Sequence, residues 1–434
     1  MQTTWLLLKV AVVRYIPTPP VFDIFSLVHL FNPIFLGNLE NTSMKLLTTI
    51  LISIALLSLT ACSSNKVVSH SVASKASIGN STTVIDLKRL SSLASITPKL
   101  AKHRTVFVGE MHTAYADHLN QLAVIKNMHR SWKQNTSIGL EMAQQPYQSY
   151  LDDYIAGKIN EREMLMGIEW YDRWAYDFRL YRPIFDYARK NKIPLLALNI
   201  PKELTRRITK VGIKGLSPKE RKQLPTFIDR SDKKYNKRIT SVFAQHSSTR
   251  SKGIAKFLDA QLAWDEGMAY AAARYLKKNP QKRMVILAGG GHVIGGEGIP
   301  NRLDRMLGSK SVIVLNNVSG ALKASQGDFL LDSQALELPL LGRIGIGMEN
   351  SHSGVEVSMV SPHGAAKKAG IKKGDVILSL GRNKISHTID VRLFMEKTKP
   401  GDSIEMTLKR NNKKFTKKLK LSGKPKSRFS MHRK

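Results

Sequence analysis

Two short motifs place a histidine just after a glycine that ends an apolar run. In RTVFVGEMHTAYADH, Gly109 is followed by Glu110 and His112, and in MVILAGGGHV the glycines are followed by His292. Imidazole and carboxylate side chains together supply metal ligands or the groups of acid–base catalysis. A single Gly-x-x-His string arises often by chance, so either motif alone is equally consistent with a turn at a strand end.

The elements that must position these side chains are apolar runs separated by helix-periodic segments. The runs cover residues 105–110, 137–142, 194–199, 283–290 and 311–317. Near-continuous apolar strands that alternate with helices are typical of an α/β domain with a largely parallel sheet. The carboxyl ends of parallel strands share one edge, beyond which ligands bind. The polar residues expected to converge at this edge are Glu110, His112, Glu141, Asn199 and His292.

Other catalytic signatures are missing from the sequence. GGGHVIGG is no dinucleotide fingerprint, because Ile294 stands where the third glycine would follow Gly289 and Gly291. There is also no Walker A loop, no His-Glu-x-x-His motif and no Gly-x-Ser-x-Gly elbow. Phosphate-cradle, zincin and serine-hydrolase chemistries are therefore disfavoured.

The chain is strongly basic, with 68 Lys and Arg against 33 Asp and Glu and a formal net charge of +35. Such an excess suits a polyanion, an anionic membrane surface or an acidic ligand, and also a generally basic protein background. Part of it lies in a helix-like insertion from Lys202 to Lys256, between the third and fourth predicted strands. A plain crossover needs fewer residues, so a lid or subdomain is expected there.

The segment from Met44 to Cys62 has the layout of a secretory signal: one lysine, an uncharged apolar run and Leu-Thr-Ala before the only cysteine. It resembles a bacterial lipobox, which implies lipidation of Cys62. We expect residues 1–43 to be an upstream extension, 44–61 the signal peptide and 62–83 a Ser-rich tether. Ser63 after the lipidated cysteine favours the outer membrane, facing the periplasm, if the protein is from a Gram-negative bacterium.

The pattern of apolar residues divides the remaining chain into two domains and a tail. Residues 84–338 are predicted to form the α/β domain, and 339–423 a compact β-rich domain with short alternating strands and glycine turns. The last residues, 424–434, are a basic tail. Attraction of this tail to anionic lipid headgroups is an alternative to a simply solvated end.

An ordered set of motifs in residues 100–320 resembles the ChaN family of haem-binding uptake lipoproteins, which is related to the Tiki metalloproteases and the erythromycin esterases. The set comprises Gly109-Glu110-x-His112 with His118 and Gln121, LEM (140–142), QQP (144–146), Trp170 with Trp174, YRP (181–183), ALNIP (197–201), Gln261 with Asp265, MA (268–269), AGGGHV and GIP (298–300). The resemblance implies one of two sites in the first domain.

The ChaN branch implies haem, bound in a pocket between the sheet edge and the inserted helices. Haem needs apolar walls, an axial ligand such as Tyr or His, and cations for its propionates. The candidate residues are Trp170, Tyr171, Trp174, Tyr176, Tyr181 and Arg182. The axial ligand stays open among the three tyrosines. The helical spacing of the aromatic residues is equally consistent with core packing.

The Tiki branch implies a divalent metal such as Zn or Mn and hydrolysis. Its ligands would be His112 and His292 with Glu110 or Glu141, and either glutamate is the candidate catalytic group. A metal-dependent hydrolase or peptidase is therefore the alternative to haem handling. A third alternative is a non-enzymatic scaffold whose second domain is the active part.

The second domain resembles a bacterial PDZ domain along its whole length. The resemblance implies that the loop and strand Arg343, Ile344, Gly345 and Ile346 hold a peptide C-terminus, because small loop residues leave backbone N–H groups free for a carboxylate. A structural or homodimer contact is the alternative role. Nucleic acid is not expected as a partner, since no nucleic-acid-binding motif is present.

Overall fold

The computed structural model describes residues 85–246, 253–316 and 322–423. From residue 85 through the third strand, the elements are η2 (Leu87–Arg89), α3 (Leu93–Ala101), β1 (Thr105–Glu110), α4 (Tyr115–Trp132), η3 (Lys133–Asn135), β2 (Thr136–Gln144), η4 (Gln145–Tyr147), α5 (Gln148–Ala156), α6 (Glu161–Gly167), α7 (Trp170–Arg173), η5 (Phe178–Leu180), α8 (Arg182–Lys190) and β3 (Leu195–Asn199). The first domain continues with α9 (Lys202–Val211), α10 (Pro218–Arg221), α11 (Lys233–His246), α12 (Ile254–Lys278), β4 (Arg283–Gly289), α13 (Gly290–Val293), η6 (Ile294–Gly296), α14 (Ile299–Leu307), β5 (Val312–Asn316), η7 (Ala324–Gln326) and β6 (Phe329–Leu331).

The first domain is built on a parallel sheet with the strand order β3-β2-β4-β1-β5-β6. The five predicted strands are confirmed to within two residues at either end, because each is an apolar run closed by polar or turn residues. The sixth strand, β6, was not predicted, since only three residues pair with β5 and they are not fully buried. The predicted fold class, a largely parallel α/β domain followed by a β-rich domain, is confirmed.

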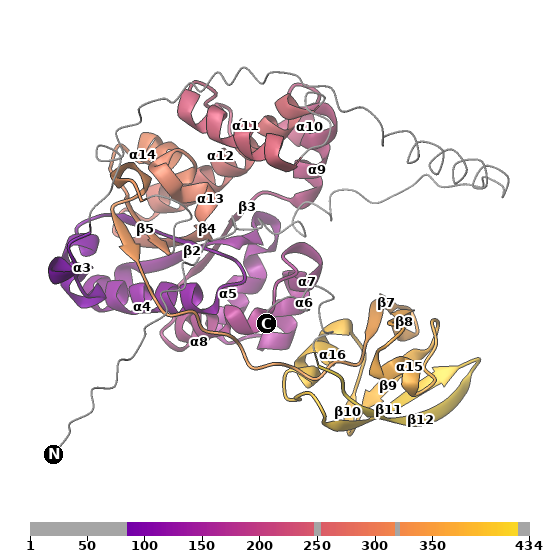
Figure 1. Cartoon of the computed structure of the whole chain (residues 1–434). Helices are drawn as coiled ribbons and strands as arrows, with labels where there is room; N and C mark the ends of the chain where they lie inside the picture. Colours follow the sequence, from indigo (N-terminus) through magenta and orange to yellow (C-terminus); the bar gives the residue numbers. More distant parts are fainter. Residues whose placement is uncertain (1–84, 247–252, 317–321, 424–434) are drawn as a thin grey trace, which may run out of the picture. The chain divides into compact units, whose positions relative to one another are not determined.

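Both faces of the sheet are covered by helices, which explains why the strands are apolar throughout. On β1, the side chains of Val106 and Val108 enter a core shared with α3, α4, α5 and α8. Phe107, between them, enters a second core shared with α12 and α14. Figure 1 shows these two groups of helices on opposite sides of the sheet.

The basic insertion forms helices, as expected. Its described part contains α9, α10 and α11, and α12 begins just before the insertion ends. It has a small core of its own, in which Leu204 and Ile208 of α9 pack with Leu224 and with Ala260 and Ala263 of α12. This core holds the insertion against the long helix that also covers the sheet, so α12 connects the two.

The second domain is a small antiparallel sheet with the order β12-β11-β9-β8-β7, and β10 pairs with β9. Its elements are β7 (Ile346–Ser351), β8 (Gly354–Val360), α15 (Ala365–Lys368), β9 (Val376–Leu380), β10 (Asn383–Lys384), α16 (Thr388–Met395), β11 (Ser403–Arg410) and β12 (Lys413–Lys420). Ile344, Val357, Ile377, Met406 and Leu408 belong to its separate apolar core.

Several expectations concern residues outside the described ranges. The predicted extension (1–43), signal peptide (44–61), lipidated Cys62, tether (62–83) and basic tail (424–434) all lie there. Within residues 85–246, 253–316 and 322–423, no helix combines the length and apolar character required to cross a bilayer.

Candidate functional site

The polar residues predicted at the strand ends do lie together. In the register of β1 and β4, Glu110 is opposite Gly289, so both Gly-x-x-His motifs leave the sheet at the same level. The carboxylate of Glu141, on β2, accepts a hydrogen bond from the Gly289 N–H at 2.6 Å and lies 3.4 Å from Nε2 of His292. Asn199, at the end of β3, donates to the backbone oxygen of Glu141 at 3.0 Å. Four strands thus contribute to one polar cluster.

The first motif forms a histidine–carboxylate pair. Nδ1 of His112 lies 2.6 Å from Oε1 of Glu110, whose side chain is fully buried, while 24% of the His112 side chain is exposed. Burial alone would raise the pKa of Glu110, but the imidazole of His112 outweighs it and holds that pKa below its ordinary value. Burial opposes a charge on His112, yet the Glu110 carboxylate keeps the His112 pKa raised. The contact between the two side chains thus favours the charged form of each.

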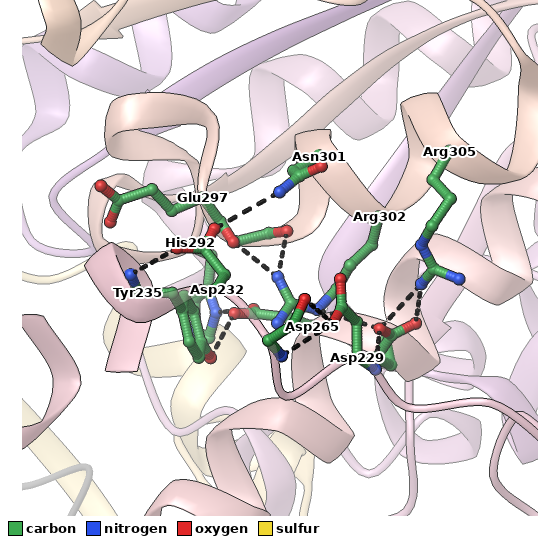
Figure 2. Close-up of polar contacts among 12 residues, drawn as sticks. Asp229, Asp232, Tyr235, Asp265, His292, Glu297, Asn301, Arg302 and Arg305 are labelled. Atoms are coloured by element: carbon green, nitrogen blue, oxygen red, sulfur yellow. Dashed lines mark hydrogen bonds and ion pairs between the residues drawn. The ribbon is translucent and has the colours of Figure 1, made fainter. Parts of the chain in front are cut away.

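The second motif forms a similar pair, extended by a tyrosine from the insertion. Nδ1 of His292 lies 2.5 Å from Oδ1 of Asp265 on α12, and the Tyr235 hydroxyl of α11 donates to the other Asp265 oxygen at 2.7 Å. Figure 2 shows these three side chains pointing toward one another. Burial lowers the pKa of His292, but Glu141 and Asp265 together raise it to about 9. His292 is thus protonated at neutral pH.

A buried polar network holds the loop that carries His292. Arg238 of α11 donates to the backbone oxygen of Gly291 at 2.9 Å and pairs with Glu297 at 3.0 Å. Arg302 of α14, which is only 2% exposed, stacks 4.5 Å from the Tyr235 ring and donates to the backbone of the same loop (Figure 2). The insertion is therefore part of the site, because it supplies two side chains that fix the second motif.

The glycines of the two motifs make room for each other. A Cβ on Gly289 would lie 2.8 Å from Cε1 of His112, and a Cβ on Gly109 would lie 2.6 Å from Cγ2 of Val293. Each glycine thus accommodates a side chain that follows the glycine of the other motif. This mutual fit explains why both strands end in glycine before the histidine.

Three buried polar atoms beside His112 have no hydrogen-bond partner among the described residues: Oε2 of Glu110, Nε1 of Trp174 and the Tyr181 hydroxyl. The His112 ring packs edge-on to Trp174 at 4.7 Å between ring centroids and lies 4.9 Å from the Tyr176 ring. Unpaired buried polar atoms are rare and mark places where a ligand atom or water is held. Oε2 of Glu110, which lies 4.0 Å from Nε2 of His118, thus has no hydrogen bond beside this aromatic wall.

The aromatic cluster 169–183 is largely core rather than pocket. Trp170 and Tyr181 are at most 1% exposed and pack with Phe178 and Phe185. Tyr171 is partly buried against the same core. Trp174 and Tyr176 contact the His112 ring, and the enclosed Tyr181 ring packs 4.2 Å from that of His118. The interpretation of the helical spacing as core packing therefore describes Trp170 and Tyr181, because a fully enclosed ring cannot line an open pocket.

Arg182, proposed as a propionate partner, is already engaged. Its guanidinium forms a double hydrogen bond with Glu161 at 2.8 and 2.9 Å. Burial alone would lower the pKa of Arg182, but the Glu161 carboxylate outweighs it and raises that pKa. Binding a propionate would mean breaking this pair, so Arg182 does not fit the expected role.

As arranged, the strand-end cluster does not fit a divalent metal. Within the described ranges, no group of three His, Cys, Asp or Glu side chains has the geometry to hold a metal ion.

An open cleft of about 750 Å³ lies at the edge of the sheet where β2 and β3 end, and the insertion and α12 form its other walls. Tyr270 projects into it from α12 and is 44% exposed. An adjoining cavity of about 440 Å³ shares Tyr270 and Arg274 and adds Phe227, Lys277, Arg305 and Met306. No carboxylate lines either space. The lining residues of the larger one are Gln145, Pro146, Pro201, Pro218, Arg221, Lys222, Gln223, Leu224, Pro225, Thr226, Gly267, Tyr270 and Arg274.

Of this cleft, the sequence singled out only Gln145, Pro146 and Pro201, through the QQP and ALNIP motifs, and of the partners of His292 it predicted only Glu141. Asp265 entered only through the resemblance, and Tyr235, Arg238 and Tyr270 were not predicted. Asp265 and Glu266 are adjacent acids in a largely apolar stretch of α12, and this was the one available signal. A buried acid on a helix requires a partner, and its partner here is His292.

In the second domain, the predicted loop presents two adjacent free amides. The N–H groups of Ile344 and Gly345 have no backbone partner among the described residues, whereas their carbonyls accept from Ala366 and Ser361. Gly345 has a φ of +80°, and a Cβ there would lie 2.7 Å from Cα of Gly364. Only glycine fits this close approach, and the resulting turn leaves the amides available for an anion.

Comparison with known proteins gives two family matches. Residues 96–303 match the model described as haem-binding uptake, Tiki superfamily, ChaN, and residues 342–421 match the PDZ domain. Among solved structures, ChaN of Campylobacter jejuni, described with cofacial haem binding, is 18% identical with a TM-score of 0.46 and covers 55% of this chain and 91% of its own. The HtrA-type protease AlgW with a decapeptide is 22% identical with a TM-score of 0.19, over 20% of this chain and 30% of its own.

Curated relatives match parts of the chain. The serine protease Do-like HtrA of Lactobacillus helveticus is 35% identical over 74 residues, which is 17% of this chain and 18% of that protein. The chloroplastic protein RETICULATA-RELATED 5 of Arabidopsis thaliana is 24% identical over 238 residues, 50% of this chain and 31% of that protein. The chain thus spans less than a third of the length of these relatives.

Proposed function

Because residues 96–303 are a ChaN-family domain of the Tiki superfamily and residues 342–421 are a PDZ domain, we propose that the chain binds haem through the first and protein C-termini through the second. We further propose that it does so as a lipoprotein of the outer membrane, in iron acquisition or haem handling. The family match supports haem as the ligand class, and the cleft beside Tyr270 is the observation that carries the proposal.

The cleft has the properties that a haem site needs. Its volume of about 750 Å³ lies within the range of ordinary ligand pockets, about 300–1,000 Å³. Prolines and Tyr270 supply apolar and aromatic surface, and Lys222 and Arg274 supply cations without a lining carboxylate to oppose propionates. It also lies between the sheet edge and the inserted helices, where the resemblance to the ChaN family predicted the haem pocket.

Within this cleft, the residues that would hold the group have separate roles. The exposed phenol of Tyr270 would hold the haem iron, since tyrosine is an established ligand of haem iron. Arg274, one turn further along α12, and Lys222 would receive the propionates, because both line the cleft and neither forms an ion pair with another of the described residues. The bound haem supplies the iron itself, and the protein binds and orients it.

A hemin titration of the full chain tests this proposal. We expect a shifted Soret band that saturates at a fixed haem-to-chain ratio. Tyr270→Phe should weaken binding at least about tenfold and change the band position, because the iron loses its ligand. Tyr150→Phe, at an exposed tyrosine outside the cleft, is the matched control. A Soret shift that survives Tyr270→Phe but is lost in His112→Ala would move haem to the strand-end cluster; no shift would reject haem binding.

The membrane anchor rests on the lipobox-like sequence around Cys62, outside the described residues. We expect the chain to fractionate with membranes and to carry a lipid mass on Cys62. Cys62→Ser should release it into the soluble fraction. Equal membrane association of both forms would contradict lipidation at this residue.

A metal-dependent hydrolase is the second candidate. The observation that favours it is the convergence of His112 and His292 on Glu141, beside Oε2 of Glu110, which lies 4.0 Å from Nε2 of His118. As arranged, these described residues do not fit a metal. Zn or Mn that is retained through purification, and lost in the His112→Ala, His292→Ala double variant, would promote this candidate. A metal content equal to that of the double variant would remove it.

A further inference from the structure

The second domain has a strongly basic strand at one end of its sheet. β12 stands at the opposite end of the strand order from β7 and pairs only with β11. Five of its eight residues are lysines, and all five are exposed: Lys413, Lys414, Lys417, Lys418 and Lys420. Residues 339–423 contain 17 Lys and Arg against 7 Asp and Glu, so this one strand carries a large part of the excess charge.

Four lysines of the β11–β12 ribbon lie on its solvent face. Side chains alternate along a strand, and residues directly opposite one another share a face. On β11, Ile404, Met406 and Leu408 pack into the domain core, so the residues between and after them face solvent. We call the lysines of this outer face the lysine strip: Lys409, Lys414, Lys418 and Lys420. The strip extends about 20 Å along β12.

The charges of the lysine strip are not neutralised within the domain. Lys409 lies directly opposite Lys414, and like charges in such a pair destabilise a sheet. None of the four lysines forms an ion pair with another of the described residues. Glu405, opposite Lys418, is the one acid on this face of the ribbon. An anionic surface in contact with the strip would therefore remove a repulsion that the folded domain retains.

Arg410, at the end of β11, extends the basic surface beyond the ribbon. Its guanidinium pairs with the buried Asp375 at 2.6 Å and donates to the backbone oxygen of Gly370 at 3.0 Å. These contacts hold the loop 370–375 against the end of the ribbon. The loop also carries Lys372 and Lys373, which are both exposed. Arg410 thus neutralises the acid of this loop and places two more lysines beside the strip.

The composition of the outer face distinguishes between kinds of partner. Besides the lysines, it has only Ser403, Glu405, Thr407 and Thr416. The centre of a protein interface is instead apolar and aromatic, and lysine is depleted there. Anionic lipid headgroups attract exposed lysines without needing such a centre, and each lysine adds to the attraction.

We infer that the lysine strip and the exposed lysines of β12 rest on an anionic lipid surface. This contact adds to the proposed anchor at Cys62 and is independent of it, because it depends on charge alone. It also leaves β7, at the other end of the strand order, accessible to a peptide.

Co-sedimentation of the full chain carrying Cys62→Ser with lipid vesicles tests this inference. The substitution removes the site of the proposed lipidation, so failure of the anchor and failure of the strip are measured separately. Phosphatidylcholine vesicles with about one quarter phosphatidylglycerol are compared with pure phosphatidylcholine, which gives the part of the binding that does not depend on charge. We expect at least about tenfold tighter binding to the anionic vesicles at low salt, and a steep loss of this preference as salt is added.

Two variants of equal charge locate the contact. The strip variant changes the three strip lysines of β12: Lys414→Gln, Lys418→Gln and Lys420→Gln. It should bind the anionic vesicles about ten- to a hundredfold more weakly, whereas arginine at the same positions should preserve binding. The control removes the same charge from exposed lysines of α11: Lys233→Gln, Lys234→Gln and Lys237→Gln. It should change binding by less than about threefold.

The opposing outcomes are distinct. Equal binding to both kinds of vesicle would reject a charge-dependent membrane contact, and equal losses in the strip variant and the control would assign the binding to net charge rather than to the strip. Capture of soluble polyglutamate without a preference for anionic vesicles would assign the strip to an acidic protein. Aggregation of the strip variant, with no vesicle preference in the parent chain, would show that the lysines only protect the sheet edge from pairing with other chains.

Discussion

The imidazole of His112 lies directly over Gly289, so close that a Cβ on that glycine would be 2.8 Å from Cε1 of the ring. These residues are far apart in the chain and belong to different Gly-x-x-His motifs. Their contact ties the two motifs into one structural unit, in which a change at one glycine displaces the other motif's histidine.

Gly289→Ala tests this relationship. The backbone of Gly289, with φ −55°, suits any residue, so the effect must come from the contact with His112. We expect a loss of about 1–3 kcal/mol in the free energy of unfolding, measured in urea, since overpacking a dense site costs this much. Gly291→Ala is the matched control, because a Cβ there meets nothing within 4 Å. Equal stability of the two variants would disprove the steric argument.

The pKa of His292 predicts a pH-dependent contribution to stability. That pKa is raised from 6.5 to about 9 in the folded chain, so the stabilisation is fully present below about pH 6.5 and is lost as pH rises through 9. The unfolding free energies of the unaltered chain and His292→Gln should therefore differ most at pH 6, by on the order of 3 kcal/mol. The gap should close by about pH 9.5. Parallel curves across this range would contradict a charged His292.

Tyr235→Phe tests how the insertion supports the second motif. The variant removes the hydrogen bond to Asp265 without opening a cavity, and leaves a buried carboxylate oxygen unpaired. We expect a loss of about 1–3 kcal/mol in unfolding free energy and a displaced His292 resonance in NMR spectra. Tyr150→Phe, at a tyrosine that is 42% exposed, should leave both unchanged. An unperturbed His292 signal in Tyr235→Phe would count against the link between α11 and the site.

Gly345→Ala tests the loop of the PDZ domain at Ile344 and Gly345, where a peptide carboxylate is proposed to bind. The substitution adds strain at φ +80° and a clash with the backbone of Gly364. Gly370→Ala carries similar strain at φ +75° but meets no atom within 4 Å, so it isolates the cost of the backbone conformation. We expect Gly345→Ala to lower the thermal midpoint of the domain further than Gly370→Ala and to abolish binding of free-carboxylate peptides. Comparable behaviour of both variants would mean that the approach of Gly364 is unimportant.

Much of the fold could be predicted from local patterns. The strands β1 to β5 are apolar runs ended by polar residues, and the PDZ domain is marked by short alternating strands with glycine turns. The three-residue strand β6 could not be predicted, because its pairing with β5 depends on tertiary position rather than on its own pattern. Convergence of Glu110, Glu141 and His292 followed from the shared edge of parallel strands.

The partners of those residues depend on packing between segments distant in sequence. Asp265 lies on a helix, and nothing in its neighbourhood in sequence indicates that it meets His292. The aromatic residues from 169 to 183 have a helical spacing that suits either a core or a pocket. Only the fold shows that Trp170 and Tyr181 are buried in the core and that Trp174 packs against His112. Tyr270 directly follows the MA motif (268–269) without being part of it, and its importance comes from the cleft.

The two domains, the parallel sheet and the edge at which the two motifs meet could be predicted from the sequence. Local apolar patterns indicate the strands and helices, and parallel strands end at one shared edge. The tertiary structure alone decided that each histidine is held by a buried carboxylate, and that the open, cationic cleft lies at Tyr270. Burial and interatomic distances set these properties, and both depend on which side chains from separate elements pack against one another.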